Sequence, residues 1–164
     1  MDECKKIVFS YNSSDEKSFA VIQKIIDNFG SSNLELFLID PKTNNTPIDE
    51  SEKYKFISKN KMAGIDLIIS VGGDGTMLKS TKLAYELEIP VTGINRGRLG
   101  FLTDINPNQA LSVIKDIISG QFDIENRMLI EVFVRNNNSL NSIGYAFNDI
   151  VINRKETGRM INIE

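Results

Sequence analysis

A carboxylate flanked by glycines is the feature of this sequence with the clearest chemical potential. Asp74 lies within Gly72-Gly73-Asp74-Gly75-Thr76, a stretch we call the glycine loop. Three glycines in four residues let the backbone turn sharply and leave its N–H groups open to a ligand. Such donors suit a phosphate, but a carboxylate that merely faced a phosphate would repel it. We therefore expect Asp74 either to accept a proton from an attacking hydroxyl or to hold a metal ion.

The glycine loop lies between an expected strand and an expected helix. Apart from Asp66, residues 65–69 are apolar and rich in β-branched side chains, as in a buried strand. After the loop, helical spacing connects Leu78, Leu83, Ala84 and Leu87. The N–H groups of the loop should then lie at a helix N-terminus, where the macrodipole favours anions. The glycine spacing matches neither a Walker A loop nor the Rossmann fingerprint. The structural alternative is a tight turn in which Asp74 only caps the helix.

Composition narrows the chemistry available to these 164 residues. The net charge of −3 gives no basic field for nucleic acid, and the absence of histidine excludes imidazole bases and histidine-bound metals. The single cysteine, Cys4, cannot form an internal disulfide, which fits a cytoplasmic location. No apolar run approaches the ~20 residues of a membrane helix, and no signal-peptide pattern is present. Acid–base chemistry must then fall to carboxylates, lysine, tyrosine or the single cysteine, and Asp74 becomes a stronger candidate by elimination.

Strand and helix patterns alternate through the first part of the chain. Strands are predicted over 6–11, 34–39, 65–69 and 91–94, and a weak helix over 52–59. Ser13 and Glu16 have capping-box spacing before a first helix that ends near Gly30. A last helix should start with Asn106 as cap and bury Ala110, Leu111, Ile114 and Ile117. The alternation predicts an α/β fold with a Rossmann-like parallel sheet. Ligands of such sheets bind beyond the carboxyl ends of the strands.

A second loop with chemical potential follows the strand over 91–94. Residues 95–104 contain two glycines and two arginines, Arg96 and Arg98, which could face a phosphate. The alternative is a solvated loop that Leu99, Phe101 and Leu102 pin to the core.

The pattern changes to antiparallel hairpins near residue 123. Apolar residues alternate over 128–134, a turn follows at 136–138, a strand is predicted over 142–152, and another begins at 160. We expect an α/β domain at 1–122 and the first strands of an all-β, β-sandwich-type domain at 123–164. Three strands leave an apolar face and sheet edges unpaired. We therefore expect further strands beyond residue 164.

Three stretches together resemble the NAD kinases of bacterial type. They are Gly-Gly-Asp-Gly-Thr-Met-Leu at 72–78, Gly-Ile-Asn at 93–95 leading to Leu-Gly-Phe-Leu-Thr-Asp at 99–104, and Asn-Asp-Ile-Val-Ile at 148–152 followed by Arg159. The resemblance implies transfer of the γ-phosphoryl of ATP, or of polyphosphate, to the 2′-hydroxyl of the adenosine ribose of NAD. The product would be NADP, and Mg²⁺ would accompany the ATP.

The resemblance also assigns roles to single residues. Asp74 would be the proton acceptor and would contact the dinucleotide with Gly75, while Lys79, one helical turn on, could reach a phosphate. Asn148 and Asp149 match an Asn-Glu pair that holds the dinucleotide, although Asp149 is one methylene shorter. Arg159 occupies a basic position near the dinucleotide. The alternatives are a solvated helix lysine for Lys79, a strand-end turn for Asn148 and an exposed turn arginine for Arg159.

Two other functions remain open at this point. The glycine loop is shared with lipid and sugar kinases, and a non-catalytic dinucleotide-binding module would carry similar residues. A later segment that completes the dinucleotide site of NAD kinases has no counterpart in the 164 residues, so this stretch alone is expected to be inactive. The expected partners are NAD and ATP, together with further copies of the full-length protein in a homo-oligomer.

Overall fold

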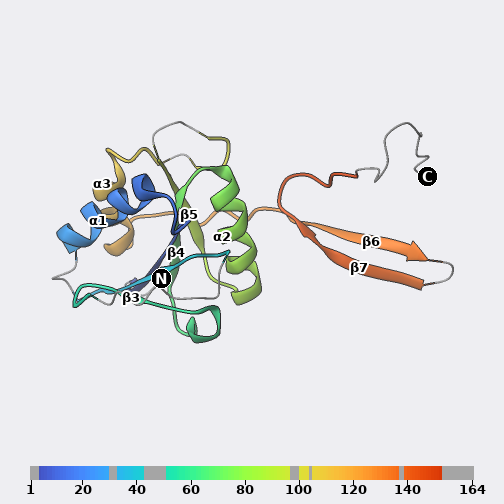
Figure 1. Ribbon diagram of the computed structural model, residues 1–164, viewed down its shortest axis with the longest axis horizontal. Coiled ribbons are helices and arrows are strands. Elements are labelled where there is room, and N and C mark those ends of the chain that lie inside the picture. Colours follow the sequence, from blue (N-terminus) through green and yellow to red (C-terminus); the bar gives the residue numbers. More distant parts are fainter. Residues whose placement is uncertain are drawn as a thin grey trace. The chain divides into compact units, whose positions relative to one another are not determined.

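A computed structural model describes residues 4–29, 33–42, 51–96, 100–103, 105–136 and 139–152. The chain divides into two compact units, Met1–Ile124 and Glu125–Glu164 (Figure 1). None of the described helices is long and apolar enough to cross a membrane.

The first unit is built on a parallel sheet. Among the described residues its strands are β1 (Lys6–Ser10), β2 (Glu35–Ile39), β3 (Lys55–Phe56), β4 (Leu67–Gly72) and β5 (Val91–Asn95), in the spatial order β3-β2-β1-β4-β5. Every pair in this sheet is parallel. The α/β prediction is thereby confirmed. Because β2 lies on one side of β1 and β4 on the other, the strand order reverses between β1 and β4.

Helices cover both faces of this sheet (Figure 1). The helices are α1 (Glu16–Phe29), α2 (Asp74–Leu87) and α3 (Ala110–Ile118). On one face, Ile7 and Phe9 of β1 pack in one apolar cluster with α1 and α3. On the other face, Val8 packs in a second cluster with Leu83 of α2. Successive side chains of a strand point to opposite faces, so both clusters follow directly from apolar residues at consecutive positions.

The weak helix predicted over 52–59 is wrong. This segment holds β3, whose Lys55 and Phe56 pair with Phe37 and Leu38 of β2, and the next residues enter a short 3₁₀ helix, η1 (Lys59–Lys61). Tyr54 and Phe56 meet edge to face with ring centroids 5.9 Å apart. Pairing with the sheet edge and aromatic packing here outweigh a weak local helix preference.

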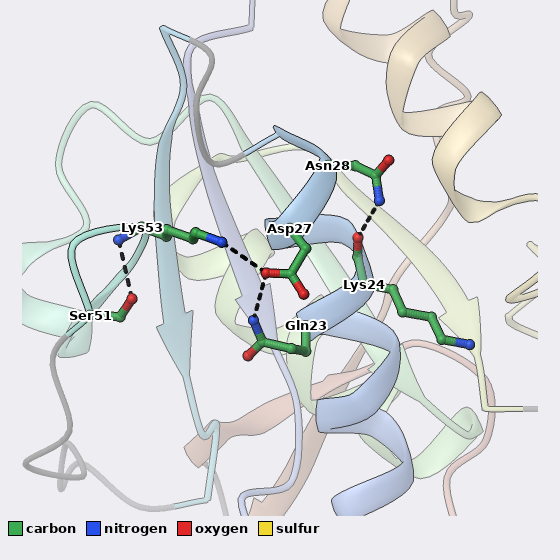
Figure 2. A network of polar contacts seen from close by, with 6 residues as sticks. All are labelled: Gln23, Lys24, Asp27, Asn28, Ser51 and Lys53. Atoms are coloured by element: carbon green, nitrogen blue, oxygen red, sulfur yellow. Dashed lines mark hydrogen bonds and ion pairs between the residues drawn. The ribbon is translucent and has the colours of Figure 1, made fainter.

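A polar network ties the segment before β3 to α1 (Figure 2). The Lys53 ammonium lies 3.0 Å from Asp27 Oδ1, which also accepts a hydrogen bond from Gln23 Nε2. The Lys53 backbone N–H donates to Ser51 Oγ, and Asn28 Nδ2 donates to the Lys24 carbonyl. These contacts are exposed, so each contributes little on its own.

Two helix starts differ from the prediction. Asp15, not Ser13, caps α1, because the Ser18 N–H donates to Asp15 Oδ1 at 3.3 Å. Helix α3 begins at Ala110 rather than at Pro107, since Asn106 accepts a hydrogen bond from the Asn108 N–H and forms a separate turn.

Two leucines predicted to face the core are instead part of the surface. Leu78 of α2 is 39% exposed and Leu111 of α3 is 37% exposed. The buried face of α2 holds Met77, Ser80, Thr81, Leu83 and Ala84. Leu83 and Ala84 are buried as predicted, but the apolar pattern did not reveal the two polar members of this face, Ser80 and Thr81.

The second unit contains a two-stranded antiparallel sheet. Strand β6 (Ile130–Asn136) pairs with β7 (Ser139–Ala146), with a bulge where Val132 faces Gly144 and Phe133 faces Ser142. The strand predicted over 142–152 therefore ends too late. Large apolar side chains are exposed on both strands, including Phe133, Leu140 and Ile143. The strand expected from residue 160 lies outside the described residues, as do Gly30 and Arg98.

Candidate functional site

A pocket of about 320 Å³ lies where four strands of the first unit end. Asn12 follows β1, Asp40 follows β2, Gly73 follows β4 and Arg96 follows β5. The pocket therefore sits at the carboxyl edge of the sheet, beside the reversal between β1 and β4, where ligands of such folds bind. Its lining also includes Asp15, Lys42, Gly75, Thr76 and Lys79.

The glycine loop supplies one wall of this pocket. The N–H groups of Thr76 and Met77 both donate to the Gly73 carbonyl, at 2.9 and 3.1 Å, and this closes the turn into α2. A Cβ on Gly72 would lie 2.7 Å from Thr76 Oγ1, so the close approach of Thr76 requires glycine. A Cβ on Gly73 or Gly75 would meet no atom of the described residues within 4 Å. Those two glycines thus leave open space in the pocket at the N-terminus of α2, a geometry that suits an anion.

Asp74 is the first residue of α2, and its carboxylate points to a neighbouring loop. The Phe101 N–H donates to Oδ2 at 3.0 Å and the Leu102 N–H to Oδ1 at 3.1 Å. A Cβ on Gly100 would lie 2.2 Å from Oδ1, so only glycine allows this approach. The N-cap is Gly73, and no side chain caps the helix. The interpretation of Asp74 as a simple cap is therefore wrong: the carboxylate holds residues 100–103.

Two further carboxylates line the pocket and stay ionised. Burial by itself raises the pKa of Asp40, but hydrogen bonds from the hydroxyl and N–H of Ser13, at 2.6 and 2.9 Å, and from the Lys42 N–H bring the pKa below its usual value. Burial also raises the pKa of Asp15, while hydrogen bonds from Arg96 and Ser18 lower it below the usual value. The pocket thus combines fixed negative charges with the cations Lys42, Lys79 and Arg96.

Residues 13–122 match the family described as ATP-NAD kinase N-terminal domain. The chain belongs to the NAD kinase family.

Curated relatives agree with this assignment. The NAD kinase of Blochmanniella pennsylvanica is 43% identical over 99 residues, which cover 60% of this chain and 33% of that protein. The NAD kinase of Chromobacterium violaceum is 41% identical over 128 residues, or 77% of this chain and 43% of that protein. The NAD kinase of Psychrobacter arcticus is 32% identical over 152 residues, or 90% and 46%. The chain thus spans between a third and a half of these relatives.

The fold agrees as well. A crystal structure of yeast NADH kinase complexed with NADH superposes with a TM-score of 0.71 at 17% identity, over 90% of this chain and 48% of that one. At this identity the likeness shows the fold alone.

Within the first unit, the structure brings the glycine-loop part of the predicted NAD kinase site together. Gly73, Gly75, Thr76 and Lys79 line the pocket, and Gly72 and Asp74 adjoin them in the glycine loop. Asn148 and Asp149 belong to the second unit, follow β7 and are exposed. Arg159 lies outside the described residues.

Some pocket residues of this NAD kinase family member were missed in the sequence. Asn12, Asp15, Asp40 and Lys42 follow β1 and β2. Ligands of parallel sheets bind beyond the carboxyl ends of the strands, and this rule was applied only to the segments after β4 and β5. Applied to β1 and β2 it would have found these residues as well, because all four strand ends meet at one edge of the sheet.

A buried hydroxyl cluster beneath the glycine loop was also missed. Ser80 Oγ of α2 lies 2.8 Å from Ser10 Oγ of β1 and 3.0 Å from Ser70 Oγ of β4. The Thr76 carbonyl lies 3.0 Å from the same Oγ and can accept its hydrogen bond. All three serines are fully buried. This cluster fastens the first turns of α2 to the two central strands and so fixes the position of the loop.

Proposed function

We propose that the full-length protein containing this chain is an NAD kinase that transfers the γ-phosphoryl of ATP, or of polyphosphate, to the 2′-hydroxyl of the adenosine ribose of NAD. The product is NADP. The observation that carries the proposal is the match of residues 13–122 to the ATP-NAD kinase N-terminal domain. The pocket beside the glycine loop, with its open glycines and three cations, supports it physically.

In this proposal the glycine loop and Lys79 bind phosphate. The N–H groups at the start of α2 and the positive end of its macrodipole attract an anion. Gly73 and Gly75 leave the space for it, and Lys79 adds a charge one turn further along the same helix. Phosphoryl transfer depends mainly on positioning and electrostatic stabilisation, which these groups supply.

Asp74 takes the proton of the ribose hydroxyl as the new P–O bond forms. Each of its oxygens accepts one backbone hydrogen bond from residues 101 and 102. A carboxylate oxygen has two lone pairs, so a further proton can be accepted while both bonds persist. The two hydrogen bonds orient the Asp74 carboxylate. In this proposal Asn148, Asp149 and Arg159 supply further contacts to the dinucleotide.

In this proposal Mg²⁺ binds together with the triphosphate of ATP. The described residues contain no group of three or more histidine, cysteine or acidic side chains that could hold a metal ion. The oxygens of Asp15 and Asp40 already accept hydrogen bonds from Ser18, Arg96, Ser13 and Lys42. These residues do not fit a dedicated magnesium site, and magnesium ions in nucleotide enzymes are often held largely by substrate phosphates and water.

The organisation of the full-length protein is part of the same proposal. Residues 1–122 form the α/β domain and residues 123–164 begin an all-β domain that binds the dinucleotide. We place the enzyme in the cytoplasm, which the single cysteine fits. We also expect a homo-oligomer, since the exposed apolar side chains of β6 and β7 need a covering surface. Sedimentation of the full-length protein would test this, and a monomer at micromolar concentration would contradict it.

A direct assay tests the activity. The full-length protein is incubated with ATP and Mg²⁺, or with polyphosphate, and with NAD, diacylglycerol or fructose 6-phosphate as acceptor. We expect NADP, which an NADP-specific dehydrogenase detects. Phosphorylation of only the lipid or the sugar would refute the proposal. Binding of NAD by calorimetry without any NADP would indicate a non-catalytic module instead.

A further inference from the structure

An ion pair joins two segments that line the pocket. Arg96 Nη1, after β5, lies 2.6 Å from Asp15 Oδ2, before α1, although the two residues are 81 positions apart. The Arg96 side chain is 56% exposed, whereas that of Asp15 is 13% exposed. A pair with such an exposed partner contributes little to stability, so stability is a weak explanation for it.

Ser18 fixes both carboxylate oxygens of Asp15, and one of them, Oδ2, also contacts Arg96. The Ser18 N–H donates to Asp15 Oδ1 at 3.3 Å, and the Ser18 hydroxyl lies 3.1 Å from Oδ2. Ser18 is itself fully buried. The carboxylate is therefore held at the start of α1, and it anchors the Arg96 guanidinium through Nη1 at the edge of the pocket.

Arg96 has donors left for a ligand. A guanidinium carries five N–H groups in a rigid plane. Within the described part of the chain, Arg96 uses Nη1 to contact Asp15. Arg96 lines the same pocket as the open glycines Gly73 and Gly75 and the Lys79 side chain. Arginine pairs with phosphate through two parallel hydrogen bonds, and the N–H groups of Arg96 that do not face Asp15 suit that pairing.

We propose that Arg96 binds the terminal phosphates of the phosphoryl donor and that Asp15 is a positioning residue that holds the guanidinium toward the glycine loop. This inference rests on the proposed function and names residues of the donor site. Asp15 acts through Arg96 and not on the phosphate, because a carboxylate repels phosphate. Binding of the donor leaves the Asp15–Arg96 contact in place and uses the remaining N–H groups.

The first test is Arg96→Met in the full-length protein, which removes the charge and keeps much of the side-chain volume. We expect the KM for ATP and the calorimetric Kd for Mg²⁺-ATP and for tripolyphosphate to rise about 10- to 100-fold, the usual effect of losing hydrogen bonds to a charged group. The KM for NAD should stay within about twofold. Arg96→Lys should recover part of the binding, since it restores a point charge without the fork.

A matched control breaks another ion pair of α1. Lys53→Met removes the contact of Lys53 with Asp27, at 3.0 Å, in the network of Figure 2. Neither residue lines the pocket, so ATP binding should remain unchanged. If Arg96→Met also left ATP and tripolyphosphate binding within twofold of the wild type, the assignment of Arg96 would be wrong.

The positioning role of Asp15 is tested by a double-mutant cycle. Asp15→Asn keeps an oxygen for the Ser18 cap but loses the charge, and we expect ATP binding to weaken about 3- to 10-fold. In the Arg96→Met background the same change should have almost no further effect, because the residue it orients is gone. An equal loss in both backgrounds would show that Asp15 acts independently and would overturn its assigned role.

Binding readouts separate this inference from the proposed function. A wild-type protein that binds Mg²⁺-ATP but makes no NADP would refute NAD kinase activity while the Arg96 variants still report on the donor site. A wild-type protein that binds neither ATP nor tripolyphosphate would refute both.

Discussion

Replacing Asp74 by asparagine should impair both the chemistry and the local structure. The carboxylate accepts the Phe101 N–H on one oxygen and the Leu102 N–H on the other. A carboxamide has one oxygen, so its NH₂ group would face one of these N–H donors. Asp74→Asn thus loses the basic site and at least one of the two hydrogen bonds that hold residues 100–103.

The two losses have different magnitudes. A hydrogen bond to a charged group contributes about 1.5–3 kcal/mol, and because Asp74 is half-buried we expect the free energy of unfolding to fall by about 1–2 kcal/mol. Loss of a general base lowers turnover about 10²- to 10⁴-fold. The full-length variant should therefore unfold at lower urea concentration and form NADP at least about 100-fold more slowly, while NAD affinity changes much less.

A glycine variant separates the two effects. Gly100→Ala places a Cβ 2.2 Å from the present position of Asp74 Oδ1 and so displaces the loop without changing the carboxylate. A displacement of about 1 Å at a site can itself cost about 10²-fold in rate. Urea denaturation and NADP formation are measured on both variants. An Asp74→Asn protein with wild-type stability would refute the loop-holding role, and one with near-normal turnover would refute the role as base.

Three further predictions concern the glycine loop and the pocket. For Gly100→Ala we expect a drop in the unfolding midpoint together with lower NADP formation. The control is Gly64→Ala, because Gly64 has a φ of +77° and open space around it. This control should lower stability without changing kcat, and equal kcat losses in the two variants would contradict the prediction. Ser80→Ala removes the link between Ser10, Ser70 and Thr76 and should lower the free energy of unfolding by about 1–3 kcal/mol. The control Ser112→Ala, on the exposed side of α3, should lower the free energy of unfolding far less in the same urea titration. The pKa of Asp40 is lower in the folded state than its usual value. The contribution of Asp40 to stability is therefore present above the unfolded pKa of about 3.9 and is lost as the pH falls below it. The stability advantage of the wild type over Asp40→Asn should shrink between pH 5 and about pH 2, and a constant difference would refute the assignment.

Much of the first unit could be predicted because its signals are local. Consecutive apolar residues at 7–9 and 67–69 indicate strands buried on both faces, and helical spacing between them indicates crossovers. The glycine loop was placed correctly where a strand ends and a helix begins, although Gly72 still belongs to β4 and α2 already starts at Asp74. The failures came where the local signal was weak or ambiguous, as at β3, whose two residues are strand only because β2 offers an edge.

The sequence by itself determined the fold class, the position of the glycine loop and the family, because each depends on residues close together along the chain. Only the tertiary structure decided which groups meet at the site. Asp74 reaches the N–H groups of residues 101 and 102, and Asp15 reaches Arg96 across 81 positions. These contacts exist because strand order brings the carboxyl ends of β1, β4 and β5 to one edge, and no local pattern encodes which strands become neighbours.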